Sequence, residues 1–114
     1  MESISLAREI AHFLESKKGE DILILDIKEI ASFTDYFVIV SGSSDRMLES
    51  LSNGLVREIK THFHRTAQPE GRGSAGWIVL DYGDVVVHLF SPLQRSYYRL
   101  EELWSEGNVV LRLM

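Results

Sequence analysis

Apolar residues recur along the chain at the spacings that helices and strands require. Across residues 3–18 they fall on one helical face, which predicts a helix that ends near Gly19. Residues 21–27 and 36–41 are short, largely apolar runs, which predict two strands. Because the run at 36–41 is apolar without interruption, we expect a central strand that is covered on both faces.

A second helix is predicted directly after this strand. The turn Gly42-Ser43-Ser44 interrupts the strand, and either Ser43 or Ser44 is a suitable N-cap. Asp45 suits the positive end of the helix dipole, whereas Gly54 weakens the helix interior. The buried stripe of this helix has spacings of three and four and consists of Leu48, Leu51, Leu55 and Ile59.

Weaker patterns cover the rest of the chain. Residues 65–69 predict a short edge strand ended by its proline, and the glycines of 71–76 predict a mobile loop. A helix is expected over 92–104, opened by its first residue, a proline, and the tail 109–114 predicts a last strand. These elements together predict one α/β domain, in which helices flank both faces of a mixed β-sheet.

Two strands joined by Tyr82-Gly83 predict a β-hairpin. They span 77–81 and 84–90, so a two-residue turn would pair Asp81 with Asp84 and, further along, Trp77 with His88. Side chains alternate along a strand, and one face of the hairpin is purely aliphatic, which assigns that face to the core. The other face carries Trp77, Val79, Asp81, Asp84, Val86, His88 and Phe90.

This second face of the hairpin is the candidate site for binding a partner. Asp81 and Asp84 repel one another as neighbours, and a basic partner would relieve that repulsion. Tyr82 is expected beside them at the exposed tip, and Trp77 is a typical interface anchor. Trp77 and Phe90 could instead be core residues beneath a helix, and this alternative stays open. The predicted partner-binding residues are Trp77, Asp81, Tyr82, Asp84 and His88.

Composition narrows the classes of partner and chemistry. The chain of 114 residues contains 12 Lys and Arg, 17 Asp and Glu and no Cys, with a net charge of −5. The lack of Cys excludes disulfides, thiol nucleophiles and Cys-ligated metals. An acidic chain is poorly suited to a phosphate backbone and better suited to a basic protein. We therefore expect no direct sequence-specific contact with nucleic acid.

Neither a membrane span nor a targeting segment is predicted. No stretch approaches the ~20 apolar residues that a membrane span needs. The N-terminal Met1-Glu2-Ser3 is acidic and polar, unlike the start of a signal or transit peptide. The expected compartment is the cytoplasm.

Few residues offer catalytic or metal chemistry. His62 and His64 point in different directions on a helix, and His88 has no second histidine in register, so no metal site is expected. No motif places a base beside a serine, and no cofactor is predicted.

An enzyme hypothesis stays open beside the binding hypothesis. The turn that contains Ser43 and Ser44 lies between a strand and a helix, where phosphate groups often bind. It lacks the lysine of a P-loop and the spacing of a dinucleotide fingerprint. In this alternative the chain is a divergent nucleotidyltransferase, with phosphate at these serines and Mg²⁺ at Asp81 or Asp84. A small module that pairs its final strand 109–113 across a two-fold axis, and so forms a homodimer, is a third hypothesis.

Three blocks of sequence resemble the ribosomal silencing factor family, also called Iojap-related proteins. They are Asp35–Arg46, Gly73–Phe90 and Arg95–Trp104, they lie in the order typical of the family, and they cover most of residues 20–105. The family's Glu-Gly-x-Gly pattern is matched by Glu70-Gly71-Arg72-Gly73, in which Arg72 adds a basic residue.

The resemblance implies a nucleotidyltransferase-like fold without the catalytic carboxylates of working nucleotidyltransferases. It also implies a protein that is not an enzyme. Members bind the fourteenth protein of the large ribosomal subunit, on the face where the small subunit docks. They thereby block subunit joining and repress translation when nutrients are scarce, with a further role in subunit maturation. An acidic, aromatic hairpin face suits such a basic partner.

Overall fold

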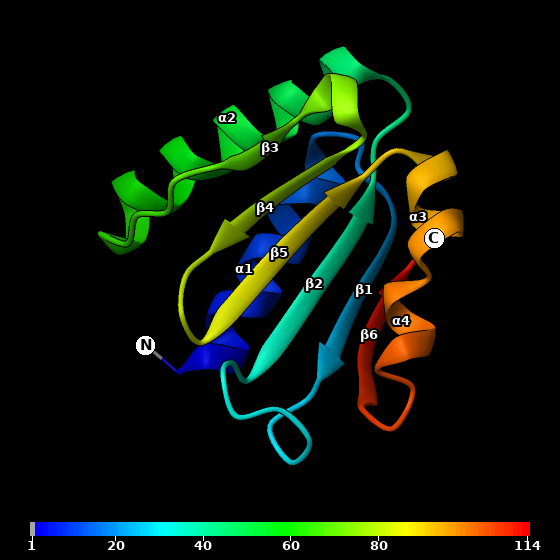
Figure 1. Cartoon of the computed structure of the whole chain (residues 1–114). Helices are drawn as coiled ribbons and strands as arrows, with labels where there is room; N and C mark the ends of the chain where they lie inside the picture. The colour runs from blue at the N-terminus through cyan, green and yellow to red at the C-terminus, as the bar shows by residue number, and fades with distance from the viewer. Residues whose placement is uncertain (1) are drawn as a thin grey trace.

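A six-stranded mixed sheet runs through the centre of the protein in a computed structural model that describes residues 2–114 (Figure 1). The strand order is β3-β4-β5-β2-β1-β6. Strands β2 and β5 are parallel, and the other neighbours pair antiparallel. The strands are β1 (Glu20–Asp26), β2 (Tyr36–Ser41), β3 (Glu70–Arg72), β4 (Trp77–Asp81), β5 (Val85–Phe90) and β6 (Asn108–Leu113).

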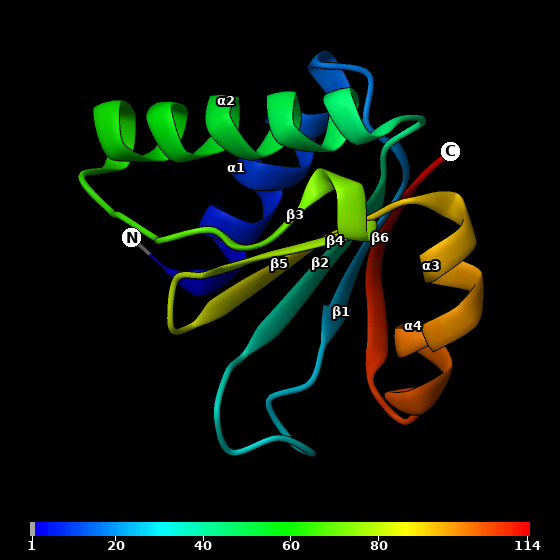
Figure 2. The ribbon, with the colours of Figure 1, turned by 45° about the horizontal axis from the view of Figure 1, so that its top comes forward.

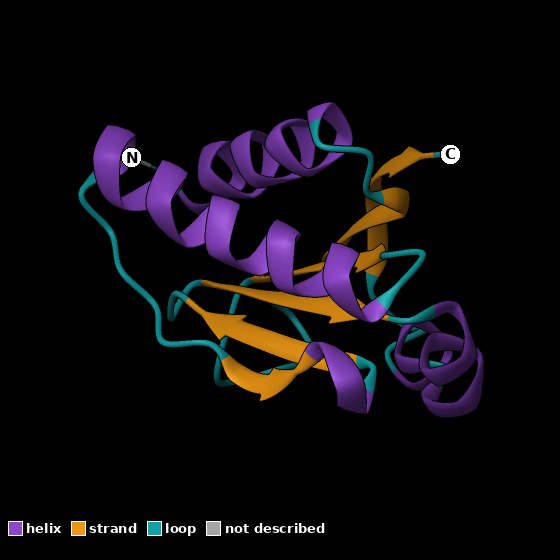
Figure 3. Ribbon diagram, turned by 90° about the horizontal axis from the view of Figure 1, so that it is seen from above, coloured by secondary structure: helices purple, strands orange, loops and turns teal. Residues whose placement is uncertain are grey.

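Helices cover the two faces of this sheet unequally. Helices α1 and α2 lie side by side over one face, and the shorter α3 and α4 lie on the other side, near β1 and β6 (Figures 2 and 3). A 3-10 helix, η1 (Gly73–Ala75), connects β3 to β4. The α-helices are α1 (Ser3–Ser16), α2 (Asp45–Phe63), α3 (Pro92–Tyr98) and α4 (Leu100–Leu103). The predicted α/β domain with a mixed sheet between helices is confirmed.

The main core lies between the sheet and the helices α1 and α2. The predicted stripe of α2 is buried, and Leu6, Ile10 and Leu14 of α1 are also fully buried against it. Each such leucine or isoleucine contributes roughly 1.5–3 kcal/mol by leaving water. Ser44 is the N-cap of α2, because its Oγ accepts a hydrogen bond of 3.0 Å from the amide of Met47.

The central position of β2 was also correctly predicted. Its bounds are those expected, and all six of its residues are buried. The final strand β6 forms as expected and pairs with β1. An uninterrupted apolar run therefore identified the strand that lies between two cores.

The region after α2 differs from the prediction. No strand forms over 65–69, and the edge strand β3 instead begins after Pro69. Proline has no N–H to donate to a strand ladder, so here it precedes the strand rather than ending it. The glycines of 71–76 contribute to β3 and η1 rather than to a loop. Arg65 follows the end of α2, and its guanidinium donates to the Tyr82 carbonyl at 2.6 Å.

The helix expected over 92–104 is broken at Arg99, which has a left-handed φ of 47°. The break redirects the chain so that Leu100 and Trp104 pack against the second core, on the face of the sheet opposite α1 and α2. Arg95 links both sides of the break: its Nε donates to the Glu101 carboxylate at 3.0 Å, and it also contacts Ser41 Oγ at 3.0 Å. A continuous amphipathic pattern could not reveal this change of direction.

The hairpin has a register different from the one predicted. Asp81 pairs with Val86 rather than Asp84, and Trp77 pairs with Phe90 rather than His88. The turn is therefore centred on Gly83 and Asp84, and Gly83 adopts a φ of 91° that favours glycine.

Because each pair in the hairpin moves by two positions, the two faces keep their predicted residues. The exception is at the tip: Tyr82 joins the aliphatic face, where it is only 6% exposed. The predicted exposure of Tyr82 is wrong.

His88 lies within the second core and is 7% exposed. Its Nδ1 accepts a 3.2 Å hydrogen bond from Trp77 Nε1, so the proton of the neutral ring is on Nε2. The ring also meets Phe37 edge to face, with 4.7 Å between centroids. Burial lowers the pKa of His88 from 6.5 to about 4, although the negative charge of Asp81 raises it by a smaller amount.

We expect this histidine to make the stability of the fold depend on pH. Below its unfolded pKa of 6.5, the unfolded chain binds a proton that the folded chain excludes until about pH 4. The free energy of unfolding should therefore fall as pH falls through this window, by about 3 kcal/mol for the full shift. Urea unfolding at a series of pH values would measure the loss.

The matched variants are His88→Asn, which removes the titrating group, and His64→Asn at the exposed, left-handed C-cap of α2. The first should flatten the pH profile, whereas the second should keep the wild-type profile. An unchanged profile in His88→Asn would contradict the assignment.

Candidate partner-docking surface

One half of the second sheet face lacks a covering helix. Residues of α4 and the turn after it cover the β1–β2 side, where Leu100 and Trp104 contact the second core. Within residues 2–114, no helix runs over β3, β4 and most of β5 on this side (Figure 1). As a result Trp77 and Val79 of β4 are only partly buried, whereas Ile78 and Leu80 on the opposite face are fully buried.

Aromatic rings take the place of a helix here. The ring of Trp77 lies between Phe90, at a centroid distance of 4.8 Å, and Tyr98 of α3, at 4.6 Å. Such pairs contribute roughly 0.5–1.5 kcal/mol each beyond the area they bury. Tyr97 meets Tyr98 edge to face and is 75% exposed. These aromatic rings thus extend from the buried Phe90 in the second core to the exposed Tyr97 at the surface.

Two shallow hollows meet at Tyr98. One lies over β3 and β4, and the other lies along α3, and each has a volume of about 340 Å³. A contiguous apolar area of this kind on a small domain is typical of an interaction surface. We call it the docking surface and define it by the apolar and aromatic residues Trp77, Val79, Leu93, Tyr97 and Tyr98.

Charged residues border the docking surface. Glu70 pairs with Val79 across the β3–β4 ladder, so its side chain lies on the same face. Asp81 follows Val79 by two positions, lies on that face too and is exposed. Arg72, paired with Trp77, is the basic exception. The border next to β4 therefore carries two acids and one base.

The two acidic residues predicted at the hairpin tip, Asp81 and Asp84, have different surroundings. Asp81 remains available, although its Oδ1 also accepts a 2.8 Å hydrogen bond from the amide of Gly83. The carboxylate of Asp84 lies 2.6 Å from the guanidinium of Arg65, so its charge is balanced within the chain. The predicted cross-strand repulsion between the two carboxylates is therefore absent, because Asp81 pairs with Val86 and Asp84 contacts Arg65 instead.

Two other predicted site residues are buried. Tyr82 faces the main core, and burial raises the pKa of its hydroxyl to about 12, against a smaller lowering by the charge of Arg65. His88 lies beneath Trp77 and holds its indole by the hydrogen bond described above. Both side chains are therefore too buried to make substantial contact with a partner protein. Trp77 combines the two alternatives, core residue and surface residue, because it contacts the second core and is also partly exposed.

The most exposed part of the docking surface was missed by the sequence analysis. Leu93 and Tyr97 lie in the segment 92–104 that was expected to form a single helix, and their side chains are 78% and 75% exposed. The adjacent pair Tyr97-Tyr98 was a weak signal, since successive residues of a helix point about 100° apart and two bulky rings need a wide buried face to cover both.

The groups required by the nucleotidyltransferase hypothesis lie at opposite ends of the sheet. Ser43 and Ser44 follow the C-terminal end of β2, whereas Asp81 ends β4, beside the start of β5. Because β2 and β5 are parallel, the length of β2, roughly 17 Å, separates them. Ser44 also has a structural role as the cap of α2. These residues therefore do not form the proposed phosphate and Mg²⁺ site.

The part of the chain that the structure describes contains neither a metal-binding cluster nor a membrane-spanning helix. Within residues 2–114, no group of three His, Asp or Glu side chains is placed to hold a metal ion. In the same part of the chain, no helix has both the length and the apolar character needed to cross a membrane.

Comparison with known proteins identifies the family. Residues 1–112 match the family model described as ribosomal silencing factor during starvation, RsfS. The ribosomal silencing factor RsfS of Bacillus subtilis is 36% identical over 107 residues, which cover 94% of this chain and 91% of that protein. The mouse protein named mitochondrial assembly of ribosomal large subunit protein 1 is 34% identical over 84% of this chain and 43% of its own length.

Solved structures agree with this match. A crystal structure of a Chromobacterium violaceum protein superimposes with a TM-score of 0.87 at 32% identity, covering 100% of this chain and 94% of the other. A Bacillus halodurans crystal structure superimposes with a TM-score of 0.75 at 32% identity, over 88% of this chain and 93% of its own. The sequence match, its coverage and the shared fold show that this chain belongs to the ribosomal silencing factor family, RsfS.

Proposed function

We propose that this protein represses translation by binding the large ribosomal subunit and preventing it from joining the small subunit. The direct partner is a basic ribosomal protein, the fourteenth of the large-subunit series, on the face where the subunits meet. The protein acts by occupying space and not by catalysis, in the compartment where ribosomes assemble. The observation that carries this proposal is the match of nearly the whole chain to the RsfS family.

The docking surface supports the proposal from the physical side. Aromatic side chains are the commonest anchors of protein interfaces, because they bury a large area at low cost in conformational entropy. Tyr97 and Tyr98 are 75% and 47% exposed, and Trp77 supports them from beneath. Glu70 and Asp81 lie next to Val79 on the same face of the sheet and would complement a basic partner.

A role in building the large subunit is a second candidate. The mouse relative is named for assembly of the mitochondrial ribosomal large subunit. A protein that binds the joining face of an immature subunit would protect it from premature joining by the same contacts. Both roles therefore require the same docking surface.

The first test is co-sedimentation with isolated subunits. We expect the protein to pellet with large subunits and not with small ones, and to lower the yield of joined ribosomes when the two are mixed. The binding should weaken as salt rises, since exposed charge pairs are screened over about 8 Å at physiological ionic strength. Equal binding to both subunits, or to neither, would refute the proposal.

Charge reversal at Asp81 tests the acidic border. Asp81→Lys should weaken binding to the large subunit by about tenfold, because a repulsive contact replaces an attractive one, and 1.4 kcal/mol corresponds to that factor. Asp81→Asn keeps the acceptor for Gly83 and should have a smaller effect. Asp84→Lys is unsuitable, because it would place a second cation beside Arg65.

The matched control is Glu9→Lys, on the exposed side of α1, on the other face of the sheet. It makes the same change in net charge and should leave binding unchanged. Equal losses in the two lysine variants would show that only overall charge matters.

Truncation of Tyr97 tests the aromatic part of the docking surface. Tyr97→Ala should weaken binding by tenfold or more, since interface anchors typically contribute about 2 kcal/mol. Its melting temperature should stay close to wild type, because the side chain is 75% exposed. His62→Ala, which removes an exposed ring from α2, is the control for both measurements. If Tyr97→Ala binds the large subunit as tightly as wild type, the contact does not involve α3.

A further inference from the structure

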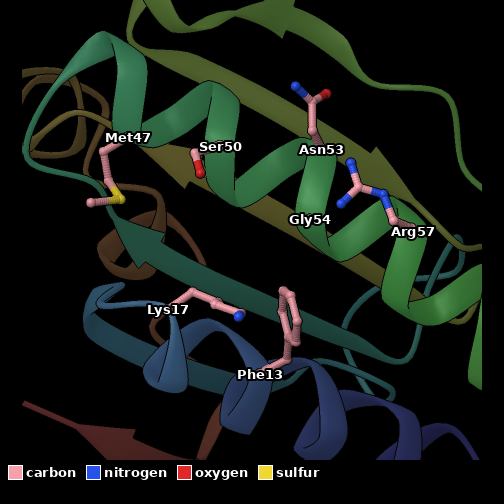
Figure 4. Close-up of a pocket in the computed structure, with 7 residues that line it drawn as sticks. All are labelled: Phe13, Lys17, Met47, Ser50, Asn53, Gly54 and Arg57. Carbon is pink, nitrogen blue, oxygen red and sulfur yellow. The ribbon is translucent and has the colours of Figure 1, made fainter.

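A groove lies between α1 and α2, on the other face of the sheet from the docking surface (Figure 4). It has a volume of about 460 Å³, within the usual range for sites that hold small molecules. Phe13 of α1 and Lys17, the C-cap that follows this helix, line one side, and α2 contributes the other five residues. They are Phe13, Lys17, Met47, Ser50, Asn53, Gly54 and Arg57.

The groove owes its shape to Gly54. A Cβ atom at this position would lie 3.3 Å from Cζ of Phe13, so a larger side chain would push against the ring. The ring of Phe13 stands between the two helices (Figure 4), and a second hollow of about 250 Å³ continues beyond it. Both hollows share Phe13, Lys17, Gly54 and Arg57 and form one elongated groove.

Two cations at this groove have no acidic partner. In the part of the chain that the structure describes, neither Lys17 nor Arg57 belongs to an ion pair, whereas Arg65 and Arg95 do. The ammonium group of Lys17 lies 5.8 Å from the centroid of Phe13, at the groove itself. The one acid of the groove, Glu58, faces His62 at 3.6 Å in the second hollow. In a chain with a net charge of −5, this is a local concentration of positive charge.

We propose that this groove binds a nucleotide unit. Lys17 and Arg57 hold the phosphate, because a guanidinium offers paired donors to phosphate oxygens and an ammonium adds charge. The partly exposed ring of Phe13 gives the base a surface on which to stack. Ser50, which extends toward the groove in Figure 4, supplies a hydroxyl for hydrogen bonding. The site does not depend on the proposed function, since it lies on the opposite side of the sheet from the docking surface.

A free nucleotide and a segment of RNA share this chemistry, and two probes distinguish them. Isothermal titration with GTP reports on the free ligand, and fluorescence anisotropy with a labelled oligouridylate reports on RNA. Both are measured at low and at physiological salt, because phosphate contacts weaken as salt rises. Binding of GTP assigns the site to free nucleotides, and binding of the oligouridylate alone assigns it to RNA. If neither probe binds at millimolar concentration, the proposal fails.

The decisive variant is the double substitution Lys17→Gln with Arg57→Gln. It removes two exposed cations, one at the C-cap of α1 and one on α2, and should weaken binding of the responding probe by about tenfold or more. The control is Arg8→Gln with Lys60→Gln, which also removes two exposed cations, one from each helix, but outside the groove. It should change affinity by no more than about twofold. If the two double variants lose the same affinity for the probe, binding depends only on general charge attraction, and the proposal is overturned.

A third variant distinguishes loss of binding from loss of folding. Ser50→Glu adds a carboxylate at an exposed position of α2 that lines the groove. It should abolish binding of the probe while thermal unfolding stays close to wild type. Normal probe binding by folded Ser50→Glu protein would show that the phosphate lies elsewhere.

Discussion

The parallel pairing of β2 with β5 at the centre of the sheet determines the arrangement of the other elements. Every residue of these two strands is buried, so both faces of the sheet must be covered where they run. Parallel neighbours also need a long connection, and α2 supplies it on the face that it shares with α1. The chain that remains after β5 must cover the opposite face, and it does so only in part.

Incomplete cover explains why the candidate site lies where it does. Leu100 and Trp104 close the second core over β1 and β2, but β4 is left without a helix. Trp77 and Tyr98 shield Phe90 instead, with the buried, neutral His88 as the acceptor for the indole N–H. A side chain held in this way is ready for contact without reorganisation, which reduces the entropy lost on binding.

Some charged residues form ion pairs that hold elements of the fold together, whereas others stay exposed to solvent. Arg65 binds Asp84 and ties the segment after α2 to the hairpin, and Arg95 binds Glu101 across the break at Arg99. Asp81 and Glu70 stay exposed beside the docking surface. Lys17 and Arg57 stay exposed at the groove on the other side of the sheet. Two exposed acids therefore border the docking surface, and the groove on the other face holds two cations that belong to no ion pair among residues 2–114.

Local patterns in the sequence were sufficient for most of the elements. The stripe of α2, its cap at Ser44, the uninterrupted run of β2 and the alternation of the hairpin each depend on neighbours within a few residues. The family could also be recognised from sequence, because its three blocks are long and specific. Burial of one hairpin face followed from alternation alone, since a shift of register by two positions leaves the faces unchanged.

Tertiary structure alone decided the features that depend on distant residues. Tyr82 turns inward and Asp84 turns toward Arg65 because the core and the segment after α2 select that register. The helix after β5 breaks at Arg99 because Leu100 and Trp104 must reach the second core. Exposure of Leu93 and Tyr97 likewise depends on how far the last helices extend over the sheet. Periodicity tells which residues share a face, but only packing between elements decides whether that face meets protein or water.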